Sequence, residues 1–180
     1  MKTLNDYIRV FPVLSKEDCD RMLQTLVNCN FEKAITMDKD GNPVPHPDRK
    51  SAITMITGTP GLEEIDAQLF KAMENGLRMY IDEYRTVTLS RDEGLSLLRY
   101  EVGEEYKEHN DSGSGNLRTL SAILYLNDNY VGGELEFTNI GRIVPPVAGQ
   151  MIIFPSNFCY PHRALPITSG TKYAVVTWLK

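Results

Sequence analysis

The hydrophobic pattern of this chain changes its period near Leu89, and this change restricts the fold more than any other feature. Before that point, two segments repeat apolar residues at helical spacing. The first follows Ser15, which forms a capping pattern with Asp18, and runs to about Cys29, while the second covers about residues 62–85. After Leu89, short stretches rich in Leu, Ile, Val, Thr and Tyr alternate with Gly, Asn, Asp and Pro. The pattern therefore predicts two helices followed by six or more strands.

The expected fold is mainly β with N-terminal helices, an α+β arrangement built on an antiparallel sandwich or double-stranded jelly roll with the helices packed on one face. The 180 residues suit a single domain, with 1–88 as a helical support region and 89–180 as the jelly-roll core. The strands are expected at Leu95–Glu101, Leu117–Leu126, Glu134–Thr138, Arg142–Val144, Gln150–Phe154 and Thr171–Leu179.

Composition excludes several classes of function. The 24 acidic residues outnumber the 19 basic ones, so the net charge of −5 offers no broad attraction to nucleic acid or to anionic membranes. The 3 cysteines form no C-x-x-C pair and are expected to be reduced thiols. No apolar run reaches the roughly 18 residues of a membrane span or the length of a signal peptide. We expect a soluble, cytoplasmic protein.

The 3 histidines are His46, His109 and His162, and two of them are placed to bind a metal. His109 and Asp111 form an H-x-D pair, and in an extended segment a spacing of two sends both side chains to the same side. His162 follows an apolar strand and a turn, so it can return beside them, whereas His46 lies in a Pro-rich segment and is expected to be dispensable. Two histidines and a carboxylate match the facial triad of non-haem Fe(II) oxygenases, with zinc as the chemical rival.

Lys172 lies ten residues after His162, in a strand whose alternation puts it on one face with Ala174, Val176 and Trp178. An unpaired buried ammonium is costly. Lys172 must therefore either extend to solvent at the end of the strand or meet an anion, and its position in the chain leaves both open.

A longer series of residues resembles the 2-oxoglutarate and Fe(II)-dependent dioxygenases of the prolyl 4-hydroxylase type. The resemblance covers about residues 95–180, and it depends on the order of its motifs: an H-x-D, then a G-G-E-L turn, then a second histidine followed by a lysine. Its residues are Tyr100, Gly103, Tyr106, His109, Asp111, Gly132-Gly133-Glu134-Leu135, Ile152-Ile153-Phe154-Pro155-Ser156, His162, Pro166, Gly170 and Lys172.

The resemblance implies a role for each matching residue. It makes the two histidines and the aspartate the iron ligands, namely His109, Asp111 and His162. It makes Lys172 the partner of the distal carboxylate of 2-oxoglutarate and Tyr100 a hydrogen-bonding partner of the same cosubstrate. Trp178 matches a tryptophan that lines the cosubstrate pocket, and Tyr106 matches an aromatic position three residues before the first ligand. For these two, plain core packing is the alternative, and Arg163 either binds substrate or is solvated.

The implied activity is hydroxylation of an unactivated C–H bond, coupled to conversion of 2-oxoglutarate and O2 into succinate and CO2, with ascorbate as a further candidate cofactor. The expected substrate is a prolyl or other residue of a peptide; the alternative is a free amino acid or small metabolite. A non-catalytic metal-binding jelly-roll module is the rival of another class. The chain departs from the family at Ser112-Gly113-Ser114-Gly115, where an aromatic residue is frequent, and in the segment 37–50. We expect the segments 37–50 and 112–116 to select the substrate; the alternative is that they are ordinary surface connections. The oligomeric state is left open.

Overall fold

Two facing β-sheets form the centre of the molecule in a computed structural model that describes residues 1–37, 43–45, 48–85, 87–113 and 117–180. The larger sheet has seven strands in the order β1-β12-β8-β15-β6-β5-β2, and all its pairings are antiparallel. Its strands are β1 (Arg9–Pro12), β2 (Glu32–Lys33), β5 (Ala52–Met55), β6 (Ser96–Tyr100), β8 (Leu120–Tyr125), β12 (Gln150–Pro155) and β15 (Lys172–Leu179).

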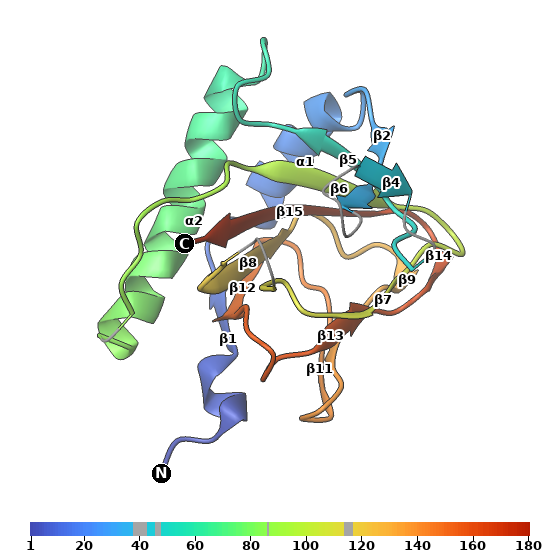
Figure 1. The fold of residues 1–180 in the computed structure, drawn as a ribbon. Helices are drawn as coiled ribbons and strands as arrows, with labels where there is room; N and C mark the ends of the chain where they lie inside the picture. Colours follow the sequence, from blue (N-terminus) through green and yellow to red (C-terminus); the bar gives the residue numbers. More distant parts are fainter. Residues whose placement is uncertain (38–42, 46–47, 86, 114–116) are drawn as a thin grey trace.

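The smaller sheet has four strands in the order β11-β10-β13-β7. They are β7 (Tyr106–His109), β10 (Leu135–Phe137), β11 (Arg142–Val144) and β13 (His162–Ala164). Two further pairs complete the strands, β9 (Val131–Gly132) with β14 (Ile167–Ser169), and β3 (Ile35–Met37) with β4 (Pro43–Pro45). Figure 1 shows β7, β11 and β13 on one side of the large sheet and helix α2 on the other.

Two helices cover the outer face of the large sheet, preceded by a short 3-10 helix, η1 (Leu4–Tyr7). Helix α1 (Lys16–Leu26) begins at Ser15, whose Oγ accepts a hydrogen bond from the Asp18 backbone N–H at 3.0 Å, so the capping pattern is confirmed. Helix α2 (Glu63–Glu83) carries the second apolar stripe. Both stripes pack into one core with alternate residues of the sheet, including Leu97, Leu124, Met151, Ile153 and Val175.

Strand alternation divides the large sheet into a helix side and an inner side. On β15, Val175 and Leu179 belong to the core beneath the helices, whereas Ala174 and Val176 face the small sheet. The face predicted to carry Lys172, Ala174, Val176 and Trp178 is confirmed, because all four line one cavity between the sheets. The inner side of the large sheet thus forms one wall of the candidate site.

The expected jelly-roll core with helices on one face is confirmed. Residues 1–88 contain both helices, but they also contain five strands, β1 to β5, that the apolar pattern did not indicate, and β1, β2 and β5 extend the large sheet. Strands β7 and β13 were missed as well. These strands are short, and β7 carries charged residues at Lys107 and Glu108, so they lack an apolar run and are defined by their pairing partners instead. Within the described ranges, no helix combines the length and apolar character needed to cross a membrane.

Candidate metal and cosubstrate site

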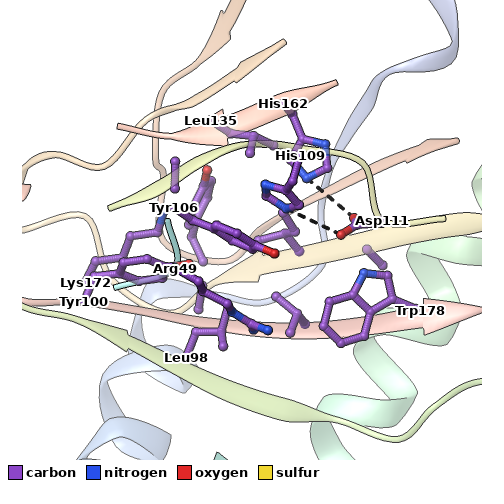
Figure 2. Close-up of a pocket in the computed structure, with 16 residues that line it drawn as sticks. Arg49, Leu98, Tyr100, Tyr106, His109, Asp111, Leu135, His162, Lys172 and Trp178 are labelled. Carbon is purple, nitrogen blue, oxygen red and sulfur yellow. Dashed lines mark ion pairs between the residues drawn. The ribbon is translucent and has the colours of Figure 1, made fainter. Parts of the chain in front are cut away.

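Three side chains that sequence analysis singled out meet at one end of the cavity. His109 ends β7 and His162 begins β13, and the two are paired residues in neighbouring antiparallel strands. Asp111 lies between them, with Oδ1 3.6 Å from His109 Nε2 and Oδ2 3.5 Å from His162 Nε2. Their ligand atoms all lie within 4.8 Å of one another, and Figure 2 shows both rings directed at the carboxylate. This cluster could hold a metal ion through three protein ligands.

The backbone orients both imidazole rings for metal binding. His109 Nδ1 is 2.8 Å from the carbonyl oxygen of Lys107, and His162 Nδ1 is 3.0 Å from that of Tyr160. A carbonyl oxygen only accepts, so each Nδ1 donates its proton and each Nε2 keeps its lone pair for a metal. Burial lowers the pKa of His162, which keeps the ring in the neutral form that binds a metal.

Asp111 is fixed by buried hydroxyl groups. Ser121 donates a hydrogen bond to Asp111 Oδ2 at 2.6 Å, and the Ser121 and Ser156 hydroxyl oxygens are 2.8 Å apart. Burial alone would raise the pKa of Asp111, but His162, His109 and the Ser121 hydroxyl together hold it below its ordinary value. The carboxylate is therefore ionised and oriented before any metal arrives.

A cavity extends from this cluster between the two sheets. Most of its wall is apolar, including Leu98, Ile123, Leu135 and Val176. The cavity therefore offers a mostly apolar chamber beside the three candidate metal ligands.

Lys172 lines the cavity away from the metal cluster and does not extend to solvent. It is 4% exposed, and its Nζ donates a hydrogen bond to the Gly133 carbonyl oxygen at 2.7 Å. The ammonium lies 5.2 Å from the ring centroid of Tyr100 and 5.1 Å from that of Tyr125. Among the described residues no carboxylate forms an ion pair with it. Of the two predictions for Lys172, the structure therefore favours an anion partner that the described residues do not supply.

Tyr100 and Tyr106 both line the cavity. Tyr100 is buried and paired with Lys172 across β6 and β15, and burial raises its pKa to about 12, so its phenol stays a hydrogen-bond donor. Tyr106 stacks on His109, with ring centroids 3.5 Å apart and planes inclined by 15°. Tyr106 is thus a wall of the site and not only part of the apolar core.

Trp178 lies in the same cavity, but at its metal end. Figure 2 shows it beside Asp111 and far from Lys172, which lies six residues earlier on the same strand. The guanidinium of Arg118 covers the Trp178 ring at 3.8 Å. Trp178 therefore lies closer to the three candidate metal ligands than Lys172 does.

Among the remaining sequence candidates, Arg163 does not join the site, and others lie wholly or partly outside the described residues. Arg163 follows His162 but is exposed, and its Nε pairs with Glu136 at 2.7 Å outside the cavity wall. His46 lies outside the described residues, as do parts of both segments expected to select substrate, 38–42 and 46–47 in the first and 114–116 in the second.

Sequence analysis also missed residues that the structure brings to the cavity. Tyr125 lies in a predicted strand, and its alternation with Ile123 could have placed it on the inner face. Arg49 has no such signal, because it lies in the Pro-rich segment and reaches the cavity only through its pairing with Tyr106.

Comparisons with known sequences agree with this geometry. The profile of the 2OG-Fe(II) oxygenase superfamily matches residues 95–180. A PKHD-type hydroxylase of Rippkaea orientalis is 33% identical over 70% of this chain and 61% of its own length. Human prolyl 3-hydroxylase 2 is 36% identical over 46% of this chain and 12% of its own length. The chain thus spans less than two thirds of the length of these curated relatives.

Solved structures share the whole fold. A prolyl hydroxylase of Trichoplax adhaerens, in complex with a peptide fragment of the hypoxia inducible factor oxygen degradation domain, has a TM-score of 0.79 at 19% identity and covers 98% of this chain and 84% of its own. The viral collagen prolyl hydroxylase of Paramecium Bursaria Chlorella virus-1, in complex with 2OG, has a TM-score of 0.71 at 22% identity, with 96% and 95% covered. The solved structures share the fold, and the family profile, the order of the motifs and the histidine–aspartate cluster support a 2OG-Fe(II) oxygenase that is prolyl 4-hydroxylase-like.

Proposed function

We propose that this protein is an Fe(II)- and 2-oxoglutarate-dependent dioxygenase that hydroxylates a C–H bond, with a prolyl or other residue of a peptide as its substrate and succinate and CO2 as coproducts. The observation that carries the proposal is a single cavity with three metal-binding side chains at one end and the buried Lys172 ammonium toward the other. A keto acid with two carboxylates matches both ends at once.

The residues present fit the metal and the cosubstrate. His109, Asp111 and His162 would hold Fe(II) and leave adjacent positions for the keto acid and O2, and the bound iron would supply the oxidising chemistry. Lys172 would bind the far carboxylate. The Tyr125 hydroxyl is buried in the same wall, has no hydrogen-bond partner among the described residues, and would donate to that carboxylate. The buried Lys172 ammonium and the Tyr125 hydroxyl would thereby each gain a partner.

A peptide substrate is supported by human prolyl 3-hydroxylase 2, which is a prolyl hydroxylase by name, and by the structural neighbour that holds a peptide fragment. A non-catalytic metal-binding module would have no use for a buried ammonium without a counter-ion, and Lys172 therefore favours the enzyme. Ascorbate as a reductant and a cytoplasmic location are part of the proposal; the second rests on three free cysteines, Cys19, Cys29 and Cys159.

Anaerobic titration of the purified protein with Fe(II) and then 2-oxoglutarate tests the proposal. We expect a visible absorption band from the iron–keto acid chelate that needs both additions and that His162→Ala abolishes. When air is admitted, the protein should convert 2-oxoglutarate to succinate. We expect the rate of succinate release to rise with proline-containing peptides and to rise further with ascorbate. Metal binding without a band or any 2-oxoglutarate affinity would instead identify the non-catalytic module.

A further inference from the structure

Arg49 brings a second cation into the cavity, next to the space that a substrate would occupy. It precedes β5 and pairs with Tyr106 of β7 through an isolated antiparallel bridge. Its guanidinium lies 5.1 Å from the Tyr106 ring, and Figure 2 shows it reaching into the cavity below Tyr106. Because Tyr106 also stacks on His109, the guanidinium lies one aromatic ring away from the metal cluster.

The hydrogen-bonding capacity of Arg49 is mostly unused. Nη1 donates to the Ile35 carbonyl oxygen at a long 3.4 Å, and the buried Nε has no hydrogen-bond partner in the part of the chain that the structure describes. No carboxylate of the described residues forms an ion pair with Arg49, whereas Arg118 pairs with Glu93 and Arg163 pairs with Glu136. A guanidinium stays charged in proteins, and leaving a buried donor unpaired is unfavourable. The site therefore lacks an acceptor at this position.

The charges of the loaded cavity indicate what that acceptor is. Its charged lining residues are Arg49, Lys172 and Asp111. The two positive charges of bound Fe(II) would be balanced by the two carboxylates of 2-oxoglutarate. The positive charge of Lys172 would be balanced by the negative charge of Asp111. The histidines bind a metal as neutral rings. Arg49 remains as the one uncompensated charge among the described lining residues, so the complete complex is one negative charge short.

We infer that Arg49 binds a carboxylate of the substrate, so that the preferred substrates carry a carboxylate beside the hydroxylated carbon. This inference rests on the proposed function and narrows its substrate class. The carboxylate has two sources, the free carboxyl group of an amino acid or of a C-terminal residue, and the acidic side chain of a residue next to the target in a peptide. A planar guanidinium holds either by two parallel hydrogen bonds, which fixes the position of the neighbouring C–H bond.

The experiment compares carboxylate probes with their amides on the intact protein. The first pair is L-proline and L-prolinamide, extended to the other L-amino acids and their amides. The second pair is proline-containing peptides with Asp or Glu beside the proline, and the same peptides with Asn or Gln. Binding to protein loaded with Mn(II) and 2-oxoglutarate is followed by the fluorescence of Trp178, the 1 tryptophan of the chain, which lines the cavity. Substrate-stimulated succinate release is measured with Fe(II).

We expect one carboxylate series to bind about ten- to a hundredfold more tightly than its amides, and Arg49→Gln to remove that preference while Arg49→Lys keeps part of it. Arg99→Gln is the matched control, because Arg99 also covers an aromatic ring, Phe31 at 4.4 Å, but does not line the cavity. It should retain the preference. Melting temperatures of all variants report whether they fold.

Each outcome decides between clear alternatives. Preference for the free amino acids identifies a small-metabolite hydroxylase, and preference for the acidic peptides identifies a peptide hydroxylase; both support the role of Arg49. The role of Arg49 is overturned if carboxylate probes and their amides bind equally well. It is also overturned if neither the free amino acids nor the acidic peptides bind. A loss of 2-oxoglutarate affinity in Arg49→Gln as large as in Lys172→Ala would assign Arg49 to the cosubstrate instead. Failure of the proposed function is recognised separately, as wild-type protein without a chelate band.

Discussion

At the scale of single residues, Lys172 is a buried lysine that forms no ion pair with any described residue. Burial lowers its pKa to about 7, and the more distant Glu134 opposes this shift only in part. Because the ordinary pKa of a lysine is near 10.4, the unfolded chain binds more protons than the folded one between about pH 7 and pH 10. The contribution of Lys172 to the free energy of unfolding therefore rises with pH across that window, and an anion beside the ammonium reverses the shift.

We expect 2-oxoglutarate binding at pH 8 to take up close to one proton per site, since the carboxylate restores the charge of Lys172. Calorimetric titration of Mn(II)-loaded protein in two buffers of different ionisation enthalpy measures this uptake. Lys172→Ala should abolish it and weaken 2-oxoglutarate binding by about ten- to a hundredfold while Mn(II) affinity stays unchanged. Unchanged keto-acid affinity in this variant would show that the ammonium is not the clamp.

Lys172→Arg should restore the affinity only in part. The planar guanidinium differs in shape from the ammonium that lies near the Tyr100 and Tyr125 rings and donates to the Gly133 carbonyl oxygen. The same calorimetric titration measures it. Full recovery would mean that charge alone, without the geometry of the ammonium, holds the cosubstrate.

Tyr125 and Tyr130 form a natural pair of variants. Both hydroxyl groups are buried and have no hydrogen-bond partner among the residues described, but Tyr125 lines the cavity and Tyr130 does not. We expect Tyr125→Phe to weaken 2-oxoglutarate binding by about 0.5–1.5 kcal/mol and Tyr130→Phe to leave it unchanged. Neither variant should lower the melting temperature, because no protein hydrogen bond is lost. Equal effects of the two substitutions would remove Tyr125 from the cosubstrate site.

At the scale of elements, Arg118 connects the segment that carries Asp111 to strand β15. Its Nε donates to both Glu93 carboxylate oxygens at 3.1 Å, Nη1 donates to the Asp111 carbonyl oxygen at 3.3 Å, and its guanidinium covers Trp178 at 3.8 Å. Lys180 also pairs with Glu93 at 2.9 Å. Burial would raise the pKa of Glu93, but Arg118 and Lys180 lower it overall, so the network loses stability only as acid protonates the carboxylate.

We expect Glu93→Gln to release Arg118 and to cost about 1.5–3 kcal/mol of unfolding free energy, the contribution of hydrogen bonds to charged groups. The fluorescence of Trp178 should change, and Mn(II) affinity should fall, because the Asp111 loop loses its support. Glu136→Gln is the control. It breaks the ion pair with Arg163 at the surface and should alter neither the fluorescence of Trp178 nor the Mn(II) affinity. A loss of stability in Glu93→Gln without any change in fluorescence or Mn(II) affinity would make the network purely structural.

At the scale of the whole molecule, the proposed ligands join two sheets. The two histidines belong to the small sheet and Lys172 belongs to the large one, with the cavity between them. A metal and a keto acid that contact both would link the sheets, and a ligand that binds only the folded state stabilises it by mass action. At a hundredfold excess over the dissociation constant this amounts to about 2.7 kcal/mol.

Mn(II) and 2-oxoglutarate, each at a hundredfold excess, should together contribute about 5 kcal/mol and raise the melting temperature by about 10–20 °C for a domain of this size. His162→Ala should abolish the shift from both ligands, while Lys172→Ala should keep the part due to the metal. Differential scanning calorimetry measures each shift. A full shift in His162→Ala would place the metal elsewhere on the protein.

The amino-acid sequence by itself determined the types of ligand and the faces on which they lie. Strand alternation put Lys172 and Trp178 on one face, because both belong to one extended strand. The H-x-D spacing correctly brought His109 and Asp111 together, although β7 ends at His109 and Asp111 lies in the bend that follows. The two helices could be predicted equally well from the sequence, because an amphipathic stripe and a cap are local features.

Only the tertiary structure decided which residues meet across segments. Strands β7 and β13 are too short and too polar to have an apolar signal, and they exist because they pair with each other at His109 and His162. Arg49 reaches the cavity only through its bridge to Tyr106. Two further features depend on contacts between remote segments, which no local period encodes. One is the position of Trp178 far from Lys172 in the cavity, and the other is that no described carboxylate forms an ion pair with Arg49.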